Sequence, residues 1–490
     1  MGKEPRDPLK ELLLSVEDGD AEITHLPEQG QTRLAIVLFT VLLFASGLTY
    51  FLLTLPAEVR VHRVVLTERL NESPYFKRPF GTNDLKCDWV MDGKHKEYVE
   101  KLAKNRYRIE DPDNFDDLPG DCASIRSRHR FPSSPTTPDE ADFPVAIARN
   151  VFKDYYYMEL MLAATYQPQN YYCYAIDKSA DHLFRARIKA LAKCFPNVMV
   201  AQEFREMDSA GHRMDLAHID CLKMLTTPEK KWKYVMLLQN HDFPAKTNFE
   251  KVAIFKWLNG SNDIELNPEP GRVNKSLDWS LTKMKIFKDP KKLEKIMTAW
   301  KSTAPPKITF AKGYNEISIS REAMDYMFNE LDLTNLMNQV DDGKTYGIDE
   351  IVFPTLLSMD LLGIPGHYTQ KCIDEDVSSG YITRHSNWGD RGTCSSGHFR
   401  HSICIYGIED LATHIDPIPA IYVNKLMPDF DFNAVTCWLE VLYNRTFIEK
   451  PTLARLGREY YANLKHVRYQ ALKDEHGEVS EEKRKNFKCK

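Results

Sequence analysis

The sequence predicts an α/β fold with a mainly parallel sheet, preceded by a single transmembrane helix and a stem. Short apolar strands alternate with helical segments from about residue 144 onward, an order that favours a parallel sheet. One uninterrupted apolar segment lies near the N-terminus, and turn-forming residues fill the chain between these two regions. The 490 residues therefore divide into an anchor, a stem and one large domain.

The alternation is visible in the apolar periodicity of individual segments. The expected strands are short apolar runs at residues 171–177, 197–201, 234–238 and 317–319. The expected helices cover residues 180–194, 215–225 and a segment that begins at Ser320. The third helix carries a stripe of Met and Phe at helical spacing, from Met324 to Phe328, which we expect to pack in the core.

The apolar segment near the N-terminus covers residues 34–55 and reads LAIVLFTVLLFASGLTYFLLTL, without a charged residue. As a helix these 22 residues would extend roughly 33 Å, enough to cross a bilayer core of about 30 Å. A buried core helix is rarely apolar on every face for this length, and the apolar part of a signal peptide is shorter. The segment therefore predicts one transmembrane helix, although the mean hydropathy of the whole chain is only -0.45.

Cysteines and glycosylation sequons predict which side of the membrane the large domain occupies. All ten cysteines follow the predicted span, and disulfides form in oxidising compartments such as a lumen. Four sequons also follow it, beginning at Asn71, Asn259, Asn274 and Asn444. We expect a type II protein with a cytoplasmic tail at 1–33, a lumenal stem at 56–121, a folded domain at 122–450 and a C-terminal extension at 451–490 whose last 20 residues fray.

Composition and missing motifs exclude several classes of function. A net charge of -5 argues against a protein that coats nucleic acid. The sequence has no GxGxxG, Walker A, HExxH, GxSxG or CxxC motif. Dinucleotide-binding, phosphate-loop, zincin and serine-hydrolase functions and CxxC zinc sites therefore have no motif support. A metal-dependent nucleotide-sugar transferase would place two aspartates after a buried strand. The strand at 234–238 is followed by Asn240-His241-Asp242, which supplies one carboxylate.

Eight short segments, each weak alone, carry a family resemblance when taken in order. They are NYYCYAIDKSA from Asn170, LAKCFPNVMVA from Leu191, KWKYVMLLQNHDFPAKTNFE from Lys231, NDIE from Asn262, SREAMDYMF from Ser320, GIDEIVFPTL from Gly347, SICIYGIEDL from Ser402 and YVNKLMPDFD from Tyr422. With the type II anchor they resemble the core-2/I-branching β-1,6-N-acetylglucosaminyltransferase family over roughly residues 122–437. The resemblance implies a GT-A-like fold, a Golgi location, a UDP-sugar donor and an inverting transfer without a divalent metal or other cofactor.

The resemblance also implies catalytic roles. Transfer from a UDP-sugar to a hydroxyl needs a base near the attacking oxygen and positive charge near the departing diphosphate. Glu350, in the GIDE segment, matches the family's base for the acceptor 6-hydroxyl, and Arg400 and Lys425 match the two cations that replace a metal. The spacing of Arg400 is one residue off, so His401 is its alternative, because a one-residue shift in a strand reverses the side chain's face.

Further binding residues follow from the same match. Asp177, at the end of the first strand, matches an acid that contacts the nucleotide, and Glu265 matches a carboxylate that binds acceptor hydroxyls. Trp388 matches an aromatic residue that stacks on a sugar, with core packing as an equal alternative. Arg272 or Lys275 could supply the remaining acceptor-binding cation.

The resemblance implies a disulfide pattern as well. The implied pairs leave Cys372 and Cys489 over, and they are Cys122–Cys194, Cys173–Cys221, Cys87–Cys437 and Cys394–Cys404. The family's free cysteine before the DFP motif is absent here, because Asn240 and His241 stand there, so thiol reagents should find no target at that place.

These observations lead to a hypothesis about function. We expect a Golgi enzyme, held in the membrane by one helix, that transfers N-acetylglucosamine in β-1,6 linkage from a UDP-sugar to a Gal- or GalNAc-containing O-glycan of a glycoprotein. One alternative keeps the fold but uses another donor sugar, glucose or xylose, because pocket details rather than the fold select the donor. The other is a non-catalytic lumenal glycan-binding protein. No nucleic-acid partner is expected, and the sequence makes no prediction of oligomeric state.

Overall fold

The structure, a computed structural model, describes residues 61–63, 76–300, 302–389, 394–475, 477 and 479–490. The predicted tail and membrane span lie outside these ranges, so the anchor stays a prediction. Among the helices that are described, none has the length and apolar character needed to cross a membrane. The contacts within the chain group residues Val61–Lys490 into one compact unit.

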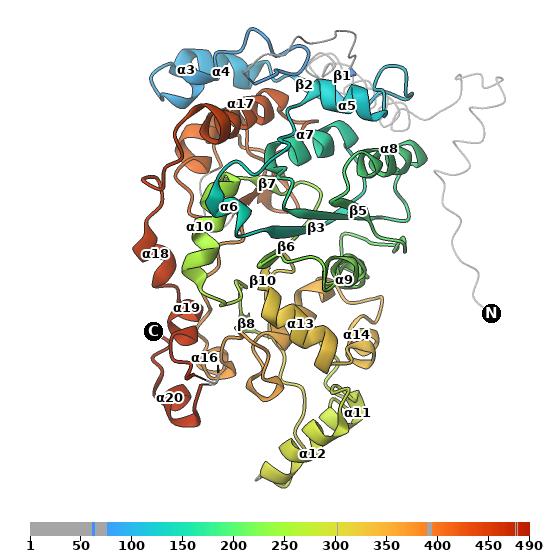
Figure 1. Cartoon of the computed structure of the whole chain (residues 1–490), viewed down its shortest axis with the longest axis vertical. Coiled ribbons are helices and arrows are strands. Elements are labelled where there is room, and N and C mark those ends of the chain that lie inside the picture. The colour runs from blue at the N-terminus through green and yellow to red at the C-terminus, as the bar shows by residue number, and fades with distance from the viewer. Residues whose placement is uncertain (1–60, 64–75, 301, 390–393, 476, 478) are drawn as a thin grey trace, which may run out of the picture. The chain divides into compact units, whose positions relative to one another are not determined.

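A five-stranded sheet lies at the centre of this unit (Figure 1). Its strands, in spatial order, are β10 (Ser318–Ser320), β6 (Tyr234–Leu238), β3 (Val145–Val151), β4 (Tyr171–Ile176) and β5 (Val198–Val200). The last four run parallel, and β10 pairs antiparallel with β6. The predicted α/β class with a mainly parallel sheet is therefore confirmed, and four of its strands match predicted segments.

The central strand, β3, was not among the predicted strands. All seven of its residues are buried, as expected for a parallel strand covered on both faces, but Arg149 and Asn150 interrupt its apolar run. Both polar side chains find backbone partners: Arg149 Nη1 donates to the carbonyls of Gln239 and Asp242, and Asn150 Nδ2 donates to that of Met214. Only the tertiary structure supplies these partners.

Helices cover both faces of the sheet. In Figure 1, α7 (Tyr155–Thr165) and α8 (His182–Lys193) lie on one side, and α9 (Met214–Leu225) and α13 (Arg321–Glu330) lie on the other. Alternate residues of β3 enter separate apolar clusters, with Ile147 on the α7 side and Ala148 on the α9 side. The predicted helices are confirmed, and the Met stripe of α13 packs in the core.

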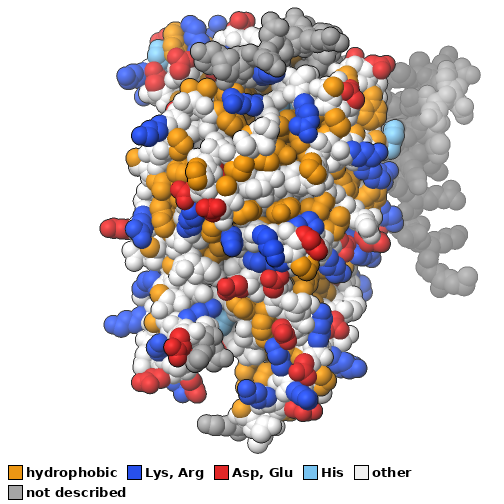
Figure 2. Space-filling model, viewed as in Figure 1, with side chains coloured by type: hydrophobic (Ala, Val, Ile, Leu, Met, Phe, Trp, Pro, Cys, Tyr) orange, Lys and Arg blue, Asp and Glu red, His pale blue; other side chains and the backbone are white. Residues whose placement is uncertain are grey.

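Two smaller units carry residues of the predicted site. A three-stranded sheet consists of β11 (Arg384–Ser386), β14 (Tyr422–Asn424) and β7 (Phe243–Pro244), with β14 in the centre. A hairpin consists of β12 (Phe399–Arg400) and β13 (Ile403–Cys404). On the face shown in Figure 2, acidic and basic side chains are interspersed, in agreement with the nearly balanced charge.

The described part of the predicted stem is folded against the domain. It contains α3 (Cys87–Met91), α4 (Lys96–Lys104) and β2 (Arg108–Glu110), which pairs with β1 (Val61–Arg63). The backbone amide of Ile109 donates to the carbonyl of Pro428 at 3.1 Å. This segment therefore extends the folded domain toward the N-terminus.

The predicted fraying of the C-terminus is wrong. The last part of the chain forms α18 (Arg458–Ala462), α19 (Lys465–Gln470) and α20 (Glu481–Asn486). Cys489 is buried in a disulfide with Cys372, and the Phe487 ring packs edge-on against Tyr368 and Tyr469. Lys and Glu side chains cover the solvent side of this segment. Its composition therefore does not indicate that Phe487 and Cys489 attach it to the domain.

The remaining elements connect these parts. They are α5 (Cys122–Arg128), α6 (Pro138–Ala141), α10 (Asn248–Leu258), β8 (Asn267–Pro268), α11 (Leu281–Met284), α12 (Pro290–Ala299), β9 (Ala311–Lys312), α14 (Thr334–Val340), η1 (Ile348–Glu350), α15 (Val352–Leu356), η2 (Asp360–Leu362), α16 (Gln370–Asp374), η3 (Ile408–Asp410), η4 (Leu411–Ile415), α17 (Phe432–Tyr443) and η5 (Asn444–Ile448).

All ten cysteines are paired. The four disulfides implied by the resemblance are confirmed. The two cysteines that the prediction left over, Cys372 and Cys489, form the fifth bond. No free thiol is present among the described residues, so the expectation for thiol reagents holds at Asn240 and His241.

Candidate active site

A cavity of about 430 Å³ opens at the carboxyl ends of the parallel strands. Loops that follow β3, β4 and β6 form one wall, and η1, the β12–β13 hairpin and the residue after β14 form the others. Ligands bind at this edge of α/β sheets. Five predicted site residues line the cavity: Asp177, Glu350, Trp388, Arg400 and Lys425.

Glu350 is held at the end of η1 by two cations. Its Oε2 accepts a hydrogen bond from Arg272 Nη1 at 2.5 Å and lies 3.4 Å from Lys312 Nζ. Lys312 Nζ also lies 3.7 Å from Glu265 Oε2, so this lysine joins the two predicted carboxylates. The Glu350 carboxylate therefore lies within ion-pair distance of two cations, one from the segment before α11 and one from β9.

A close backbone approach makes this arrangement possible. The amide of Gly313 donates to the carbonyl of Glu350 at 2.9 Å, and a Cβ at Gly313 would lie only 1.8 Å from the carbonyl oxygen of Glu265. Only glycine fits between these two backbones. Lys312, in β9, lies beside both Glu265 and Glu350, so Glu265 is close to Glu350 although it does not line the cavity.

Lys425 and Arg400 are cations without a carboxylate partner among the described residues. Neither makes an ion pair or a side-chain hydrogen bond there, whereas Arg272, Lys312 and Arg384 are all paired. Burial, followed by the charges of Arg400 and Arg384, lowers the pKa of Lys425 to about 8. Two unpaired cations that repel each other at one cavity form a site for an anion.

The β12–β13 hairpin explains how Arg400 and its alternative, His401, both line the cavity. Arg400 is the last residue of β12 and pairs with Ile403, and the two residues between them form the turn with φ of 51° and 62°. The rule that neighbouring strand residues face opposite ways does not apply where the strand ends. Burial and the charges of Lys425 and Arg400 lower the pKa of His401, which favours its neutral ring.

Asp177 continues the hydrogen-bonded ladder of β4, since its amide donates to the carbonyl of Val151. Its Oδ1 accepts from the amide and hydroxyl of Ser179, and its Oδ2 accepts from the amide of Met207 at 2.9 Å. The carboxylate therefore orders two loops at the cavity rim, and its Oδ2 can accept one more hydrogen bond.

Arg384, which the sequence prediction missed, lies at the centre of the site. Its buried guanidinium pairs with Glu316 at 2.5 Å and lies 3.6 Å from Asp242, the only carboxylate in the Asn240-His241-Asp242 run. Asp242 Oδ1 also accepts from Asn424 Nδ2 at 2.8 Å. This network fixes the residue that precedes Lys425. No local motif marks Arg384, because its partners come from distant segments.

The predicted acceptor-binding residues have different surroundings. Trp388 is half-buried, lines the cavity and donates from Nε1 to Tyr314 Oη at 2.7 Å. Of the two candidate cations, Arg272 contacts Glu350, whereas Lys275 is exposed and lies 3.7 Å from Glu269. Lys312, which was not predicted, occupies the place next to both carboxylates.

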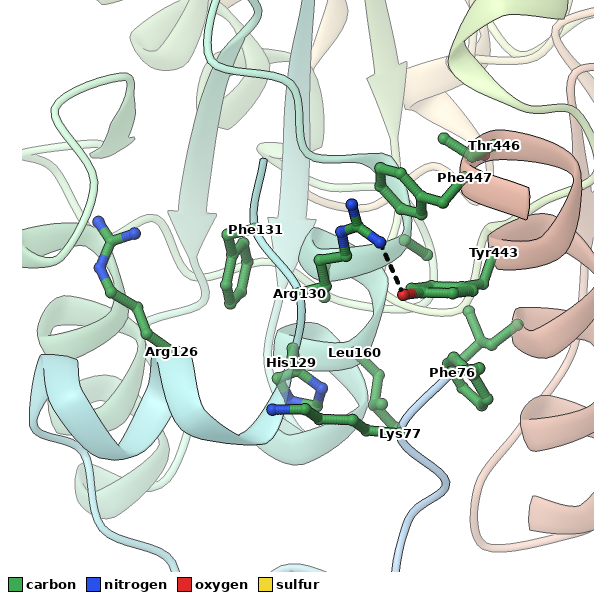
Figure 3. A pocket seen from close by; sticks show the side chains of 13 residues that line it. Phe76, Lys77, Arg126, His129, Arg130, Phe131, Leu160, Tyr443, Thr446 and Phe447 are labelled. Carbon is green, nitrogen blue, oxygen red and sulfur yellow. Dashed lines mark hydrogen bonds between the residues drawn. The ribbon is translucent and has the colours of Figure 1, made fainter. Parts of the chain in front are cut away.

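A different cavity, of about 530 Å³, lies between α5, α7 and α17 and contains none of the predicted site residues (Figure 3). Its cations already have partners. Arg130 donates to Tyr443 Oη and lies 4.5 Å from the Phe447 ring centroid, and Lys77 donates to the carbonyl of Ser127. These contacts attach the N-terminal segment to α17. They explain the positions of the side chains that line this cavity, and no ligand is needed to explain them.

Comparisons with known proteins identify relatives. The family model described as "Branch: Core-2/I-Branching enzyme" matches residues 145–414. A beta-1,3-galactosyl-O-glycosyl-glycoprotein beta-1,6-N-acetylglucosaminyltransferase 4 from Danio rerio is 30% identical over 375 residues, which cover 74% of this chain and 85% of that protein. The corresponding enzyme 3 from Mus musculus is 26% identical over 378 residues, with coverage of 74% and 84%.

A human beta-1,3-galactosyl-O-glycosyl-glycoprotein beta-1,6-N-acetylglucosaminyltransferase is 28% identical over 380 residues and covers 74% of this chain and 86% of that protein. Among solved structures, the mannosyltransferase Ktr4p from S. cerevisiae matches 56% of this chain and 75% of that chain, at 12% identity and a TM-score of 0.20. That structural likeness is too slight to support an argument.

Proposed function

The chain belongs to the core-2/I-branching enzyme family, and on this premise we propose that it transfers N-acetylglucosamine in β-1,6 linkage from a UDP-sugar to an O-glycan. The acceptor is a Gal- or GalNAc-containing glycan of a glycoprotein, in keeping with the names of the relatives. The observation that carries the proposal is one cavity lined by Glu350 and by two cations, Arg400 and Lys425, that have no carboxylate partner among the described residues.

The reaction assigned to this cavity is a single inverting displacement. Glu350 accepts the proton of the acceptor 6-hydroxyl while that oxygen forms a bond to the anomeric carbon of the donor. The bond between the anomeric carbon and the diphosphate breaks, and its electron pair leaves with UDP. Arg400 and Lys425 offset the charge that develops on the diphosphate, the role that a metal ion has in other transferases.

Other residues position the two substrates. We assign Asp177 to the nucleotide, because its carboxylate lies at the strand ends with acceptor capacity left on Oδ2. Glu265 and Trp388 are assigned to the acceptor sugar, one as a hydrogen-bond acceptor and one as a stacking surface. The GT-A-like architecture and the Golgi location, with residues 34–55 as the membrane anchor, are part of the same proposal.

The direct test is a transfer assay with the full-length, detergent-solubilised protein. UDP-N-acetylglucosamine, UDP-glucose and UDP-xylose would each be offered with O-glycan acceptors in the presence of EDTA. We expect transfer of N-acetylglucosamine that survives EDTA and falls by a factor of about 10² to 10⁴ in Glu350→Gln. The matched control, Glu482→Gln, changes an exposed glutamate on α20 and should keep wild-type activity.

Each alternative predicts a different result in this assay. Transfer of glucose or xylose would identify another donor. Activity that requires a divalent metal would overturn the role given to Arg400 and Lys425. Glycan binding without transfer of any sugar would show a binding protein that retains the fold.

A further inference from the structure

A second cavity, of about 570 Å³, adjoins the candidate active site. The two cavities share three lining residues, Tyr314, Arg384 and Trp388. The rest of the second cavity is formed by β11 with its neighbours Tyr381 and Asn387, by His414 of η4 and the segment that follows it, and by Tyr460 of α18. Because the shared residues stand between the two spaces, a ligand that reaches Glu350 past Trp388 can extend into the second cavity.

The walls of this second cavity are rich in aromatic rings. Trp388 Nε1 donates to Tyr314 Oη at 2.7 Å, and the Tyr314 and Tyr381 ring centroids lie 5.4 Å apart. Tyr381 is fixed in turn, because its hydroxyl donates to the carbonyl of Glu316. Tyr460 stands at the rim with 49% of its surface exposed. Rigid rings of this kind offer flat apolar surfaces, which fit the C–H faces of pyranose sugars.

The polar groups of this cavity suit a neutral ligand. No Asp, Glu or Lys is among the described residues that line it. Arg384 and His414 do line it, but the charge of Arg384 is already matched by Glu316 and Asp242, and His414 Nδ1 lies 3.4 Å from Asp410 Oδ1. Burial and the nearby charge of Arg384 lower the pKa of His385, so its ring is neutral in the free protein.

One hydroxyl in this cavity is left without a partner. Ser386 Oγ is buried and has no hydrogen-bond partner in the described chain, although it belongs to β11 and lines the space. A buried polar atom without a partner costs free energy, and a sugar hydroxyl can satisfy it. Flat rings, an unpaired hydroxyl and no free charge together select a neutral carbohydrate over an acidic glycan or a charged peptide.

We propose that this second cavity is a subsite for neutral sugars of the acceptor glycan that lie beyond its Gal-GalNAc disaccharide. The inference rests on the proposed function and defines its substrate further: the preferred acceptor is an extended neutral O-glycan. Trp388 and Tyr314 form the boundary between the two subsites, and Tyr460 and Ser386 contact only the extension.

The test compares acceptors of different length. Full-length enzyme would be assayed with a Gal-GalNAc disaccharide, with the same disaccharide extended by two neutral sugars on its galactose, and with a glycopeptide that carries the disaccharide. We expect a higher kcat/KM for the extended glycan. Tyr460→Ala should lower kcat/KM for that acceptor about five- to ten-fold more than for the disaccharide, as expected for the loss of one stacked ring. Tyr460→Phe keeps the ring and should retain the preference.

Equilibrium binding of the extended glycan, measured by calorimetry without donor, separates the two proposals. Binding that weakens in Tyr460→Ala and in Ser386→Ala supports the subsite even if no donor sugar is transferred. Equal losses for short and extended acceptors, or no preference for the extended glycan, would overturn it. A preference for the glycopeptide that Tyr460→Ala removes would assign the cavity to polypeptide instead and would also contradict the proposal.

Discussion

Lys425 differs from the other cations around the catalytic cavity in what surrounds it. Arg272, Lys312 and Arg384 each face a carboxylate at 2.5 to 3.7 Å. Lys425 has no carboxylate partner among the described residues, and burial and the charge of Arg400 both lower its pKa. The free energy that holds these two like charges together is supplied by the fold, and a bound diphosphate would relieve the repulsion.

This environment predicts how donor binding depends on pH. The pKa of Lys425 is lowered to about 8, so the free protein loses this charge as the pH rises above that value. The affinity for UDP should therefore be constant near pH 7 and fall above about pH 8, by up to tenfold per pH unit. Calorimetric titrations with UDP between pH 7 and 9.5 would measure it.

Lys425→Arg provides the control for this prediction. A guanidinium stays charged throughout this range, so the variant should bind UDP without the decline above pH 8. The same decline in Lys425→Arg would show that another group causes it.

At the level of elements, the turn before η1 determines where the base lies. Gly347 has φ of 72°, its amide donates to the carbonyl of Ala210, and its own carbonyl accepts from Arg272 Nη1 at 2.8 Å. The same guanidinium nitrogen contacts Glu350. One turn therefore sets both the start of the helix and the position of the Glu350 carboxylate, the proposed base.

Gly347→Ala should damage activity more than stability. An Ala Cβ would lie 2.4 Å from Arg272 Nη1, so the arginine must leave its place beside Glu350. The left-handed backbone adds about 1 to 2 kcal/mol of strain. We expect a loss of kcat of at least tenfold in the transfer assay.

Gly343→Ala, in the same loop, is the matched control for that variant. It has φ of 68° and no atom within 4 Å of its added Cβ. It should show a similar loss of stability in thermal unfolding but keep its kcat. Equal kcat in the two variants would refute the role of the Arg272 contact.

At the level of the whole molecule, disulfides of different span serve different purposes. Cys87–Cys437 and Cys372–Cys489 close sequence separations of 350 and 117 residues and attach the two ends of the described domain. Cys394–Cys404 closes only 10 residues and braces the hairpin that carries Arg400 and the His401 turn. Chain-entropy arguments predict larger stabilisation for the longer loops.

Removal of the two kinds of disulfide should separate stability from donor binding. Cys372→Ser/Cys489→Ser should lower the free energy of unfolding by about 2 to 5 kcal/mol and leave the KM for the donor unchanged, because this bond lies outside the site. Cys394→Ser/Cys404→Ser should cost less stability but raise the KM for the donor several-fold, since Arg400 loses its support. Thermal unfolding and donor titrations would measure both; a donor KM that rises in the first variant and not in the second would contradict the assignment.

Local patterns in the sequence determined much of the fold. The strands and helices between residues 171 and 225 were predicted because apolar periodicity is a local property, recorded in consecutive residues. Asp177, Glu350 and Lys425 were identified for a related reason, since each lies in a short segment that resembles a family motif. The one-sided placement of ten cysteines likewise indicated disulfides before any pairing was known.

Only the tertiary structure decided which of these residues act together. The central strand β3 carries polar residues whose partners lie 64 to 93 positions away, and Cys372 finds Cys489 across 117 residues. Lys312 and Arg384 belong to the site because β9 and β11 bring them to Glu350 and Asp242. Contacts of this kind depend on how the chain crosses the sheet, and neighbouring residues contain no record of that path.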